Sequence, residues 1–392
     1  MDKNNGAIYD ARKLGKPKMI ILGVQHMFAM FGATILVPIL TGLDISTTLL
    51  MAGLGTLLFH CITKFKVPAF LGSSFAFLGG YAAIKAFSPN DPNSMLPYAC
   101  LGVACAGLIY FILAAVIKAV GIEKVMRFFP PVVTGPIIIA IGLGLAPSAV
   151  SNCTTNWFLA VVALAVIVVF NIWGKGMAKI IPIILGLLIS YGTGLVLYFI
   201  SQANPDLIQN VPWLFAGGAD ANGVYQPIFD FTSLNTICDN ISKGHIFGSE
   251  GLIGIPIHWD KTVFGGIDYS NGALIASSII AIVPIAFATM MEHIGDICAI
   301  SSTTGNNYIK DPGLHRTLVG DGLATTLASL FGGPANTTYG ENTGVLALTR
   351  VYDPRVIRIA AYFAVAVSFF PIVSVIIGSI PSCIIGCISF VL

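Results

Sequence analysis

The chain has 392 residues, of which 56% are hydrophobic and 10% are charged, and its mean hydropathy is +0.86. Soluble proteins carry a charged share of roughly 25%, so this composition predicts a protein embedded in lipid. The 20 Lys and Arg residues nearly balance the 18 Asp and Glu residues, which excludes a basic surface for nucleic acid. Eight cysteines without a Cys-x-x-Cys pair predict neither a zinc site nor a disulfide framework. A pairing of Cys153 with Cys238 stays open.

Apolar runs long enough for spanning helices follow one another along the chain. About a dozen of them approach the roughly 20 residues that a span in a lipid bilayer requires. They begin near Ile20, Ile45, Val67, Tyr98, Phe128, Trp157, Ile180, Gly272, Thr317, Thr338, Val356 and Pro371. The basic N-terminal tail lacks the short apolar core and cleavage site of a signal peptide.

Basic residues cluster in every second connection between these runs, and this alternation predicts the orientation. Cytoplasmic loops of membrane proteins carry an excess of Lys and Arg. The clusters consist of Lys64, Lys66, Lys118, Lys124, Arg127, Lys175, Lys179, Lys310, Arg316, Arg350, Arg355 and Arg358. We therefore expect a multi-pass protein of the cytoplasmic membrane with its N-terminus inside.

A polar stretch over residues 201–271 interrupts the apolar pattern on the predicted outer side and divides the chain into two halves. The last apolar run begins at Ser382 and reaches only about half the length of a span. We expect the chain to be truncated there.

One apolar segment in each half contains residues that oppose a continuous helix. The first begins at Val67 and reads VPAFLGSSFAF, and the second begins at Gly333 and reads GPANTTYGEN. Such residues favour irregular backbone, which lipid tolerates only where protein buries it or a cavity borders it. The pairing by half predicts two half-helices whose N-termini meet near the midplane and offer N–H groups to a solute. Simple Pro kinks are the alternative for either segment alone.

Ionisable residues are rare inside the predicted spans, where charge is costly. They are His26, Glu292, His293, Asp296, Asp321 and Glu341. An acid at the centre of a spanning helix costs on the order of 3 kcal/mol, so each acid is a candidate functional group. Glu292 and Asp296 are four residues apart and share one helix face. We expect Glu292 and Glu341, from the second broken segment, to converge on one solute.

Other roles stay open for several of these residues. His26 and His293 are equally well explained as hydrogen-bonded core histidines. Asp321 stands between two glycines, which favours a supporting polar group over a direct ligand. Two carboxylates and a histidine also permit a metal site, but their spacing matches no zinc or calcium motif.

The sequence resembles the nucleobase–ascorbate transporter family, also called nucleobase:cation symporter-2. The family signature is an acidic or amide residue, Asn, any residue, Gly, four residues, Thr and a basic residue. It stands here as ENTGVLALTR, from Glu341 to Arg350. The resemblance covers Met19 to Leu392 and includes the stretches Gln25-His26, Gly72-Ser73-Ser74-Phe75-Ala76-Phe77, Glu292-His293-Ile294-Gly295-Asp296 and Asp311-Pro312-Gly313-Leu314-His315-Arg316.

The resemblance implies an all-α polytopic membrane protein with two inverted repeats of seven segments. Segments 3 and 10 would contain short extended stretches, and segments 13 and 14 would be truncated. The implied core domain comprises residues 20–126 and 272–370, and the gate domain comprises residues 127–200 and 371–392. Residues 1–19 form a cytoplasmic tail and residues 201–271 an extracytoplasmic loop. Similar proteins often form homodimers through the gate domain.

The resemblance also implies a substrate and the residues that bind it. Glu341 at the first signature position is typical of bacterial uracil permeases, whereas xanthine and urate transporters usually carry Gln there. Glu292 and Glu341 then bind the base, and backbone N–H groups at Phe75 and Gly340 hold its carbonyl oxygens. Asp296 also belongs to this implied site, but it stands where uracil permeases have His and purine transporters commonly have Asp. An oxopurine permease is therefore the alternative.

The chemistry of uracil suits such a site, because its ring presents two N–H donors and two carbonyl acceptors. A desolvated carboxylate such as Glu292 can take up a proton on one side of the membrane and release it on the other. This predicts proton symport without a further cofactor, although sodium coupling stays open. Asp296, His26, Asp321 and Asn342 are expected to support coupling around the substrate.

Three rival classes are less well supported. A channel needs a continuous polar path, whereas the polar groups gather here at one depth. An anion transporter of the same architecture would suffer repulsion from two buried glutamates. An enzyme would need a nucleophile and base or a metal motif, and the sequence offers neither.

Overall fold

The computed structural model describes residues 7–391 apart from residues 122–123, 125–130 and 221. The chain divides into two compact units. Unit 1 comprises Met1–Ile141 and Ile255–Phe370, and unit 2 comprises Gly142–Gly254 and Pro371–Leu392. Each unit is therefore assembled from two separate stretches of the chain.

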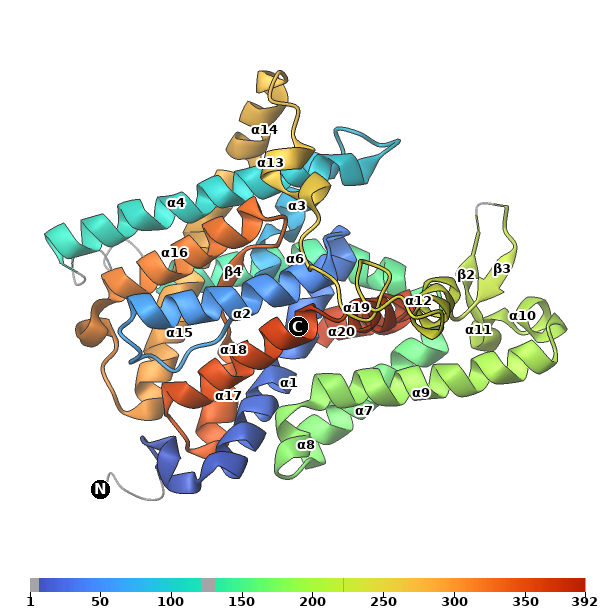
Figure 1. Cartoon of the computed structure of the whole chain (residues 1–392), viewed down its shortest axis with the longest axis horizontal. Coiled ribbons are helices and arrows are strands. Elements are labelled where there is room, and N and C mark those ends of the chain that lie inside the picture. The colour runs from blue at the N-terminus through green and yellow to red at the C-terminus, as the bar shows by residue number, and fades with distance from the viewer. Residues whose placement is uncertain (1–6, 122–123, 125–130, 221, 392) are drawn as a thin grey trace. The chain divides into compact units, whose positions relative to one another are not determined.

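Helices dominate unit 1, and two short strands lie among them (Figure 1). In chain order its elements are η1 (Ala11–Leu14), α1 (Lys16–Thr41), α2 (Ile45–Ile62), β1 (Leu71–Ser73), η2 (Phe75–Phe77), α3 (Leu78–Lys85), η3 (Pro92–Met95), α4 (Leu96–Val120), η4 (Trp259–Lys261), α13 (Val263–Gly266), α14 (Gly272–Ile282), η5 (Val283–Ile285), α15 (Ala286–Thr304), η6 (Ile309–Gly313), α16 (Leu314–Leu330), β4 (Asn336–Thr338), α17 (Gly340–Thr349) and α18 (Pro354–Ser368). The helix α6 (Pro131–Cys153) begins in unit 1 and ends in unit 2.

Unit 2 is also mostly helical. Its elements are α7 (Trp157–Trp173), α8 (Met177–Ile180), α9 (Pro182–Ala203), α10 (Asp206–Asn210), α11 (Pro212–Phe215), β2 (Ala216–Ala219), β3 (Tyr225–Pro227), α12 (Thr232–Ser242), α19 (Pro371–Gly378) and α20 (Ser382–Val391). The predicted extracytoplasmic stretch therefore contains short helices and a small hairpin.

Fewer helices reach spanning length than the sequence predicts. Within the described ranges, five helices are long and apolar enough to cross a membrane, or up to seven if each of two bent pairs forms one span. Several predicted segments are shorter because extended backbone or a sharp bend interrupts them, as between Ala146–Cys153 and Trp157–Trp173, where the bend is 119°. The predicted segment near Phe128 begins outside the described residues. The all-α polytopic fold itself is confirmed, and the repeat symmetry stays a prediction.

Glycines allow two long helices of unit 1 to approach closely. The helix α4 packs along α16, and α2 contacts both α16 and α18 (Figure 1). A Cβ on Gly107 in α4 would lie 2.7 Å from the carbonyl oxygen of Gly322 in α16. Small residues at such contacts let helices in a membrane gain van der Waals packing. Because Gly322 adjoins Asp321, this contact also fixes the position of that acid.

The N-terminal segment is tied to other connections of unit 1. The Tyr9 hydroxyl donates to the Thr304 carbonyl at 2.7 Å, and Arg355 donates to Asp10 at 3.0 Å. Hydrogen bonds from Arg12 lower the pKa of Asp10 well below its usual range. The connections after α15 and before α18 therefore lie on the same side of unit 1 as the N-terminal segment, as the alternation of basic residues predicts.

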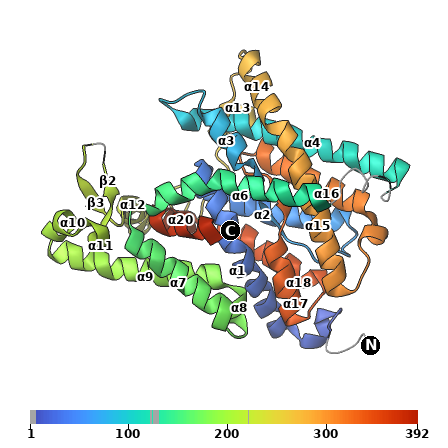
Figure 2. The same ribbon diagram turned by 180° about the vertical axis from the view of Figure 1, so that it is seen from behind.

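Unit 2 is held together by apolar helix packing and an aromatic cluster. The helices α7 and α9 run side by side, and α20 packs against α7 (Figure 2). The Asn156 side chain accepts from the N–H of Leu159 at 3.0 Å and caps α7. The rings of Phe229 and Phe231 stack with centroids 5.1 Å apart, and Tyr198 meets Phe231 edge-on at 5.4 Å.

Candidate functional site

The extended backbone predicted in both broken segments is confirmed, and the two stretches pair with each other. The strands β1 and β4 form an antiparallel ribbon in which Leu71 faces Thr338 and Ser73 faces Asn336. The helices η2 and α3 follow β1, and α17 follows β4. Because the strands are antiparallel, these helices start from opposite ends of the ribbon, which are roughly 7 Å apart. The first N–H groups of a helix have no acceptor within it, so both starts offer backbone donors.

Polar side chains on α2 and α16 satisfy the outer edges of the ribbon. The Thr56 hydroxyl accepts from the N–H of Leu71 at 2.9 Å, and His60 Nε2 donates to the carbonyl of Ala69 at 2.9 Å. On the β4 side, the Thr325 hydroxyl donates to the carbonyl of Asn336 at 2.6 Å. Buried backbone groups need such partners. The sequence does not predict a role for these residues, because that role depends on contacts with distant segments.

Tyr339, the residue before α17, reaches across to the first broken segment. Its hydroxyl donates to the carbonyl of Ser73 at 2.8 Å and lies 3.3 Å from the hydroxyl of Thr34. A Cβ on Gly72 would come within 2.5 Å of the Tyr339 ring. Gly72 is therefore required by close packing rather than by its backbone conformation, and it lets one aromatic ring link the two segments.

The helix α15 brings its acidic face to the start of α17. Glu292 is exposed on unit 1 and Asp296 is half-buried. The Thr338 hydroxyl donates to Asp296 Oδ2 at 2.9 Å. The other oxygen of Asp296 lies 3.6 Å from where a Cβ on Gly340 would stand. The structure thus brings Asp296, Thr338 and Gly340 together, with Glu292 one turn earlier on α15.

His293 and Asp321 form a buried pair behind this face. His293 Nδ1 lies 3.5 Å from Asp321 Oδ2, and both side chains are fully buried. The same nitrogen is 3.3 Å from the Thr338 hydroxyl. Asp321 therefore contacts a residue on α15, and its supporting role stays a prediction.

The remaining predicted residues lie at the two helix starts and in α1. Phe75 begins η2 and packs partly against the core. Glu341 is the second residue of α17, but its side chain lies outside the described residues. The buried side chains of Asn342 and His26 have no hydrogen-bond partner within the part of the chain that the structure describes.

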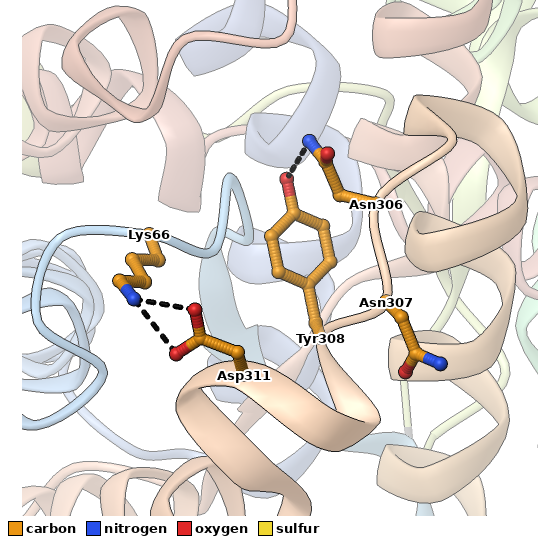
Figure 3. A pocket seen from close by; sticks show the side chains of 5 residues that line it. All are labelled: Lys66, Asn306, Asn307, Tyr308 and Asp311. Atoms are coloured by element: carbon orange, nitrogen blue, oxygen red, sulfur yellow. Dashed lines mark hydrogen bonds and ion pairs between the residues drawn. The ribbon is translucent and has the colours of Figure 1, made fainter.

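A separate surface pocket lies where two connections of unit 1 meet. It is lined by Lys66, Asn306, Asn307, Tyr308 and Asp311 (Figure 3). Lys66 Nζ contacts the two carboxylate oxygens of Asp311 at 2.7 and 2.6 Å, and Asn306 donates to the Tyr308 hydroxyl at 3.3 Å. The ion pair between Lys66 and Asp311 links the α2–β1 connection to the α15–α16 connection.

The arrangement around the ribbon combines hydrogen-bond acceptors with donors. Carboxylates on α15 accept hydrogen bonds, and the backbone at the start of α17 donates them. Within the described ranges, no group of three or more His, Cys, Asp and Glu side chains is arranged to hold a metal ion. The chemistry therefore suits a polar organic solute with both donors and acceptors.

Comparison with known proteins reveals close sequence relatives. The sequence model of the permease family (Xan_ur_permease) matches residues 17–392. The uracil permease of Bacillus caldolyticus is 37% identical over 95% of this chain and 76% of that protein. The probable uracil permease of Haemophilus influenzae is 36% identical over 96% of this chain and 79% of that protein.

Solved structures with the same fold are more distant in sequence. The transmembrane domain of a cyanobacterial bicarbonate transporter, BicA, has a TM-score of 0.63 at 12% identity and covers 98% of this chain and 88% of that chain. SLC26A9 has a TM-score of 0.52 at 12% identity, over 98% of this chain and 58% of that chain. These likenesses concern the fold. The family match and the relatives together confirm the resemblance that the signature predicts, and this chain belongs to the permease family, whose members are membrane transporters rather than enzymes.

Proposed function

We propose that this protein imports uracil across the cytoplasmic membrane by proton symport. Relatives named uracil permeases share 36–37% of its residues over most of the chain. The observation that carries the proposal is the acidic face of α15 beside the start of α17, where Thr338 binds Asp296 at 2.9 Å. There, carboxylate acceptors stand next to backbone donors.

In this proposal, each polar edge of uracil has a partner on α15 or at one of the two helix starts. The carboxylates of Glu292 and Glu341 accept hydrogen bonds from the ring N–H groups, and the N–H groups of Phe75 and Gly340 donate to the ring carbonyls. Such a site rejects analogues that leave a buried polar group unpaired. Asp296 lies beside Gly340 and completes the polar wall on the α15 side.

Coupling follows from the charge of these acids. Glu292 is the proposed proton carrier, which takes up a proton on the outer side and releases it on the inner side. Alternating access then requires movement of the core domain relative to the gate domain, and the N-terminus lies inside. Homodimerisation through the gate domain is part of the same proposal.

The test is uptake of labelled uracil and labelled xanthine into proteoliposomes under an imposed proton gradient. We expect saturable uracil accumulation that a proton uncoupler abolishes and that replacement of sodium by choline leaves unchanged. Preferential uptake of xanthine would instead favour the oxopurine alternative, for which Asp296 is the motivating residue. Accumulation that follows sodium alone would overturn proton symport.

A further inference from the structure

The segment before α1 is tied by its backbone to the end of α17. The N–H of Ile8 donates to the carbonyl of Arg350 at 2.8 Å, and the N–H of Tyr352 donates to the carbonyl of Ile8 at 2.8 Å. Ile8 thereby forms a parallel bridge with Val351, in the connection between α17 and α18. Because Arg350 is the C-cap of α17, this bridge fixes the point at which that helix ends.

The next residue of the same segment reaches the end of α15. Thr304 is the last residue of α15, and the carbonyls of the last turn of a helix have no donor within it. The Tyr9 hydroxyl donates to the carbonyl of Thr304 at 2.7 Å. The Tyr9 ring also meets the ring of Tyr352 edge-on, with centroids 5.5 Å apart. Two neighbouring residues therefore hold the ends of two helices.

A third set of contacts fixes this segment at the start of α18. The N–H of Ala11 donates to Asp353 Oδ2 at 2.8 Å, and Ala11 is fully buried in a small apolar cluster. Arg355 donates to Asp10 at 3.0 Å and to Asp353 at 3.3 Å. We call residues 8–12 the strap, because they link the ends of α15 and α17 to the start of α18.

The two helices that end at the strap also carry the acids proposed to bind uracil. The helix α15 carries Glu292 and Asp296, α17 carries Glu341, and the two helices pack against each other. Asp296 and Glu341 each stand eight residues before the last residue of their helix, which is roughly 12 Å along the axis. A tilt of either helix at its end therefore changes the separation of the acids.

We propose that the strap sets the separation of α15 and α17 and thereby the affinity for the transported base, with Ile8 and Tyr9 as positioning residues. A site that binds two edges of one small ring must hold its groups within about 0.5 Å of their places. The strap acts on the acids through the two helices, since its anchors lie at the helix ends. This inference rests on the proposed function, because it concerns the helices of the proposed uracil site.

Release of either anchor tests the strap. Tyr9→Phe removes only the hydroxyl that binds Thr304, and Ile8→Pro removes the N–H that binds Arg350. The matched controls are Ile8→Val and Tyr362→Phe, which removes the hydroxyl of an exposed tyrosine on α18. We expect each release to raise the Kd for uracil in calorimetry by about threefold to tenfold, the effect of one hydrogen bond. In proteoliposome uptake KM should rise while kcat stays within about twofold, and both controls should match wild type.

The double variant distinguishes positioning from general stabilisation. If the strap works by linking the two ends, release of one anchor already breaks the link. Tyr9→Phe combined with Ile8→Pro should then raise Kd by no more than about twofold beyond the weaker-binding single variant. Independent contributions would instead multiply, to roughly tenfold to hundredfold. Multiplied losses, or wild-type affinity in both single variants, would overturn the proposal.

Amide hydrogen exchange of the purified protein separates the strap from the identity of the substrate. Ile8→Pro should speed exchange by about threefold or more over residues 301–305 at the end of α15, although the bond that it removes lies at α17. Tyr9→Phe should do the same over residues 346–350 at the end of α17, and it alone decides if Ile8→Pro does not fold. Unchanged exchange at both ends would refute the link. If the wild-type protein binds xanthine in place of uracil, the affinities are compared with xanthine. If it binds neither base, the proposed function fails and the exchange rates still decide the strap.

Discussion

The two broken segments of unit 1 share one backbone plan but differ in their side chains. Each contains a three-residue strand followed by a helical stretch, and the two strands pair with each other. From Leu71 to Ile84 the first segment contains no acidic residue or histidine, whereas the second includes Glu341. Thr338 in the second segment also binds Asp296 on α15. The comparison indicates different roles for the two segments. The first supplies neutral backbone donors, and the second supplies both backbone donors and charged groups.

The hydrogen bonds that hold the two segments in place also differ in whether charged groups lie near them. Neutral hydrogen bonds hold β1, from Thr56 on one side and from Ser73 to the carbonyl of Thr34 at 3.0 Å on the other. The second segment is held by Thr325, and its Thr338 hydroxyl lies 3.3 Å from Nδ1 of the buried His293. Substitutions on the charged side should therefore alter coupling, and those on the neutral side should alter stability.

The largest effect is expected from Glu292→Gln, which keeps the volume and removes the charge. A hydrogen bond to a charged group contributes about 1.5–3 kcal/mol, so uracil binding should weaken by roughly one to two orders of magnitude. Accumulation against a gradient should disappear. Calorimetry and proteoliposome uptake measure the two effects, and Glu250→Gln at an exposed acid is the control. A variant that still concentrates uracil at the wild-type rate would remove Glu292 from the mechanism.

Gly72→Ala tests the neutral segment through its packing. The added methyl would lie 2.5 Å from the Tyr339 ring and 2.8 Å from the Thr34 hydroxyl. Overpacking of this kind costs about 1–3 kcal/mol, and the unfolding temperature in detergent should fall. Gly79→Ala is the matched control, because nothing lies within 4 Å of its added Cβ. It should leave stability unchanged or raise it by up to about 1 kcal/mol. Equal unfolding temperatures for the two variants would contradict the close contact between the segments.

Glu341→Gln tests whether the second broken segment determines which nucleobase the protein prefers. An ionised carboxylate only accepts hydrogen bonds, whereas the amide both donates and accepts. Uracil affinity should fall by about tenfold, which corresponds to the strength that charge adds to a hydrogen bond, and the preference should shift toward oxopurines. Competition of each base against labelled uracil uptake measures the shift. Unchanged selectivity would place Glu341 away from the substrate.

The sequence predicts this region well where the signal is local. Pro, Gly and paired Ser or Thr around Ser73 and Thr337 predict broken helices, and the spacing of Glu292 and Asp296 predicts their common face. Both signals depend on residues close in the chain, and the structure confirms the extended stretches. Among the described residues, continuous helices of spanning length are fewer than the apolar runs, because composition alone does not reveal where a bend or strand interrupts an apolar run.

Contacts between residues that lie far apart in the chain could not be predicted from the sequence. The pairing of Leu71 with Thr338 depends on a register between segments from opposite halves. The contact of His293 with Asp321 depends on how α15 is rotated against α16, which hydrophobic periodicity does not resolve in helices that are apolar on most faces. His60 and Thr56 likewise gain their roles only when β1 lies along α2.

The smallest effect is expected from Lys66→Gln, which removes the ion pair nearest to the neutral segment. Lys66 precedes that segment and pairs with Asp311 at 2.6 Å, but the two side chains are 45% and 67% exposed. Exposed ion pairs contribute at most about 1 kcal/mol, and salt screens them further. Unfolding temperature and uracil affinity should therefore stay close to wild type, and Asp311→Asn should behave in the same way. If Lys66→Gln instead lowers stability as much as Gly72→Ala does, the first segment depends on charge, and the contrast between a neutral segment and a charged one is wrong.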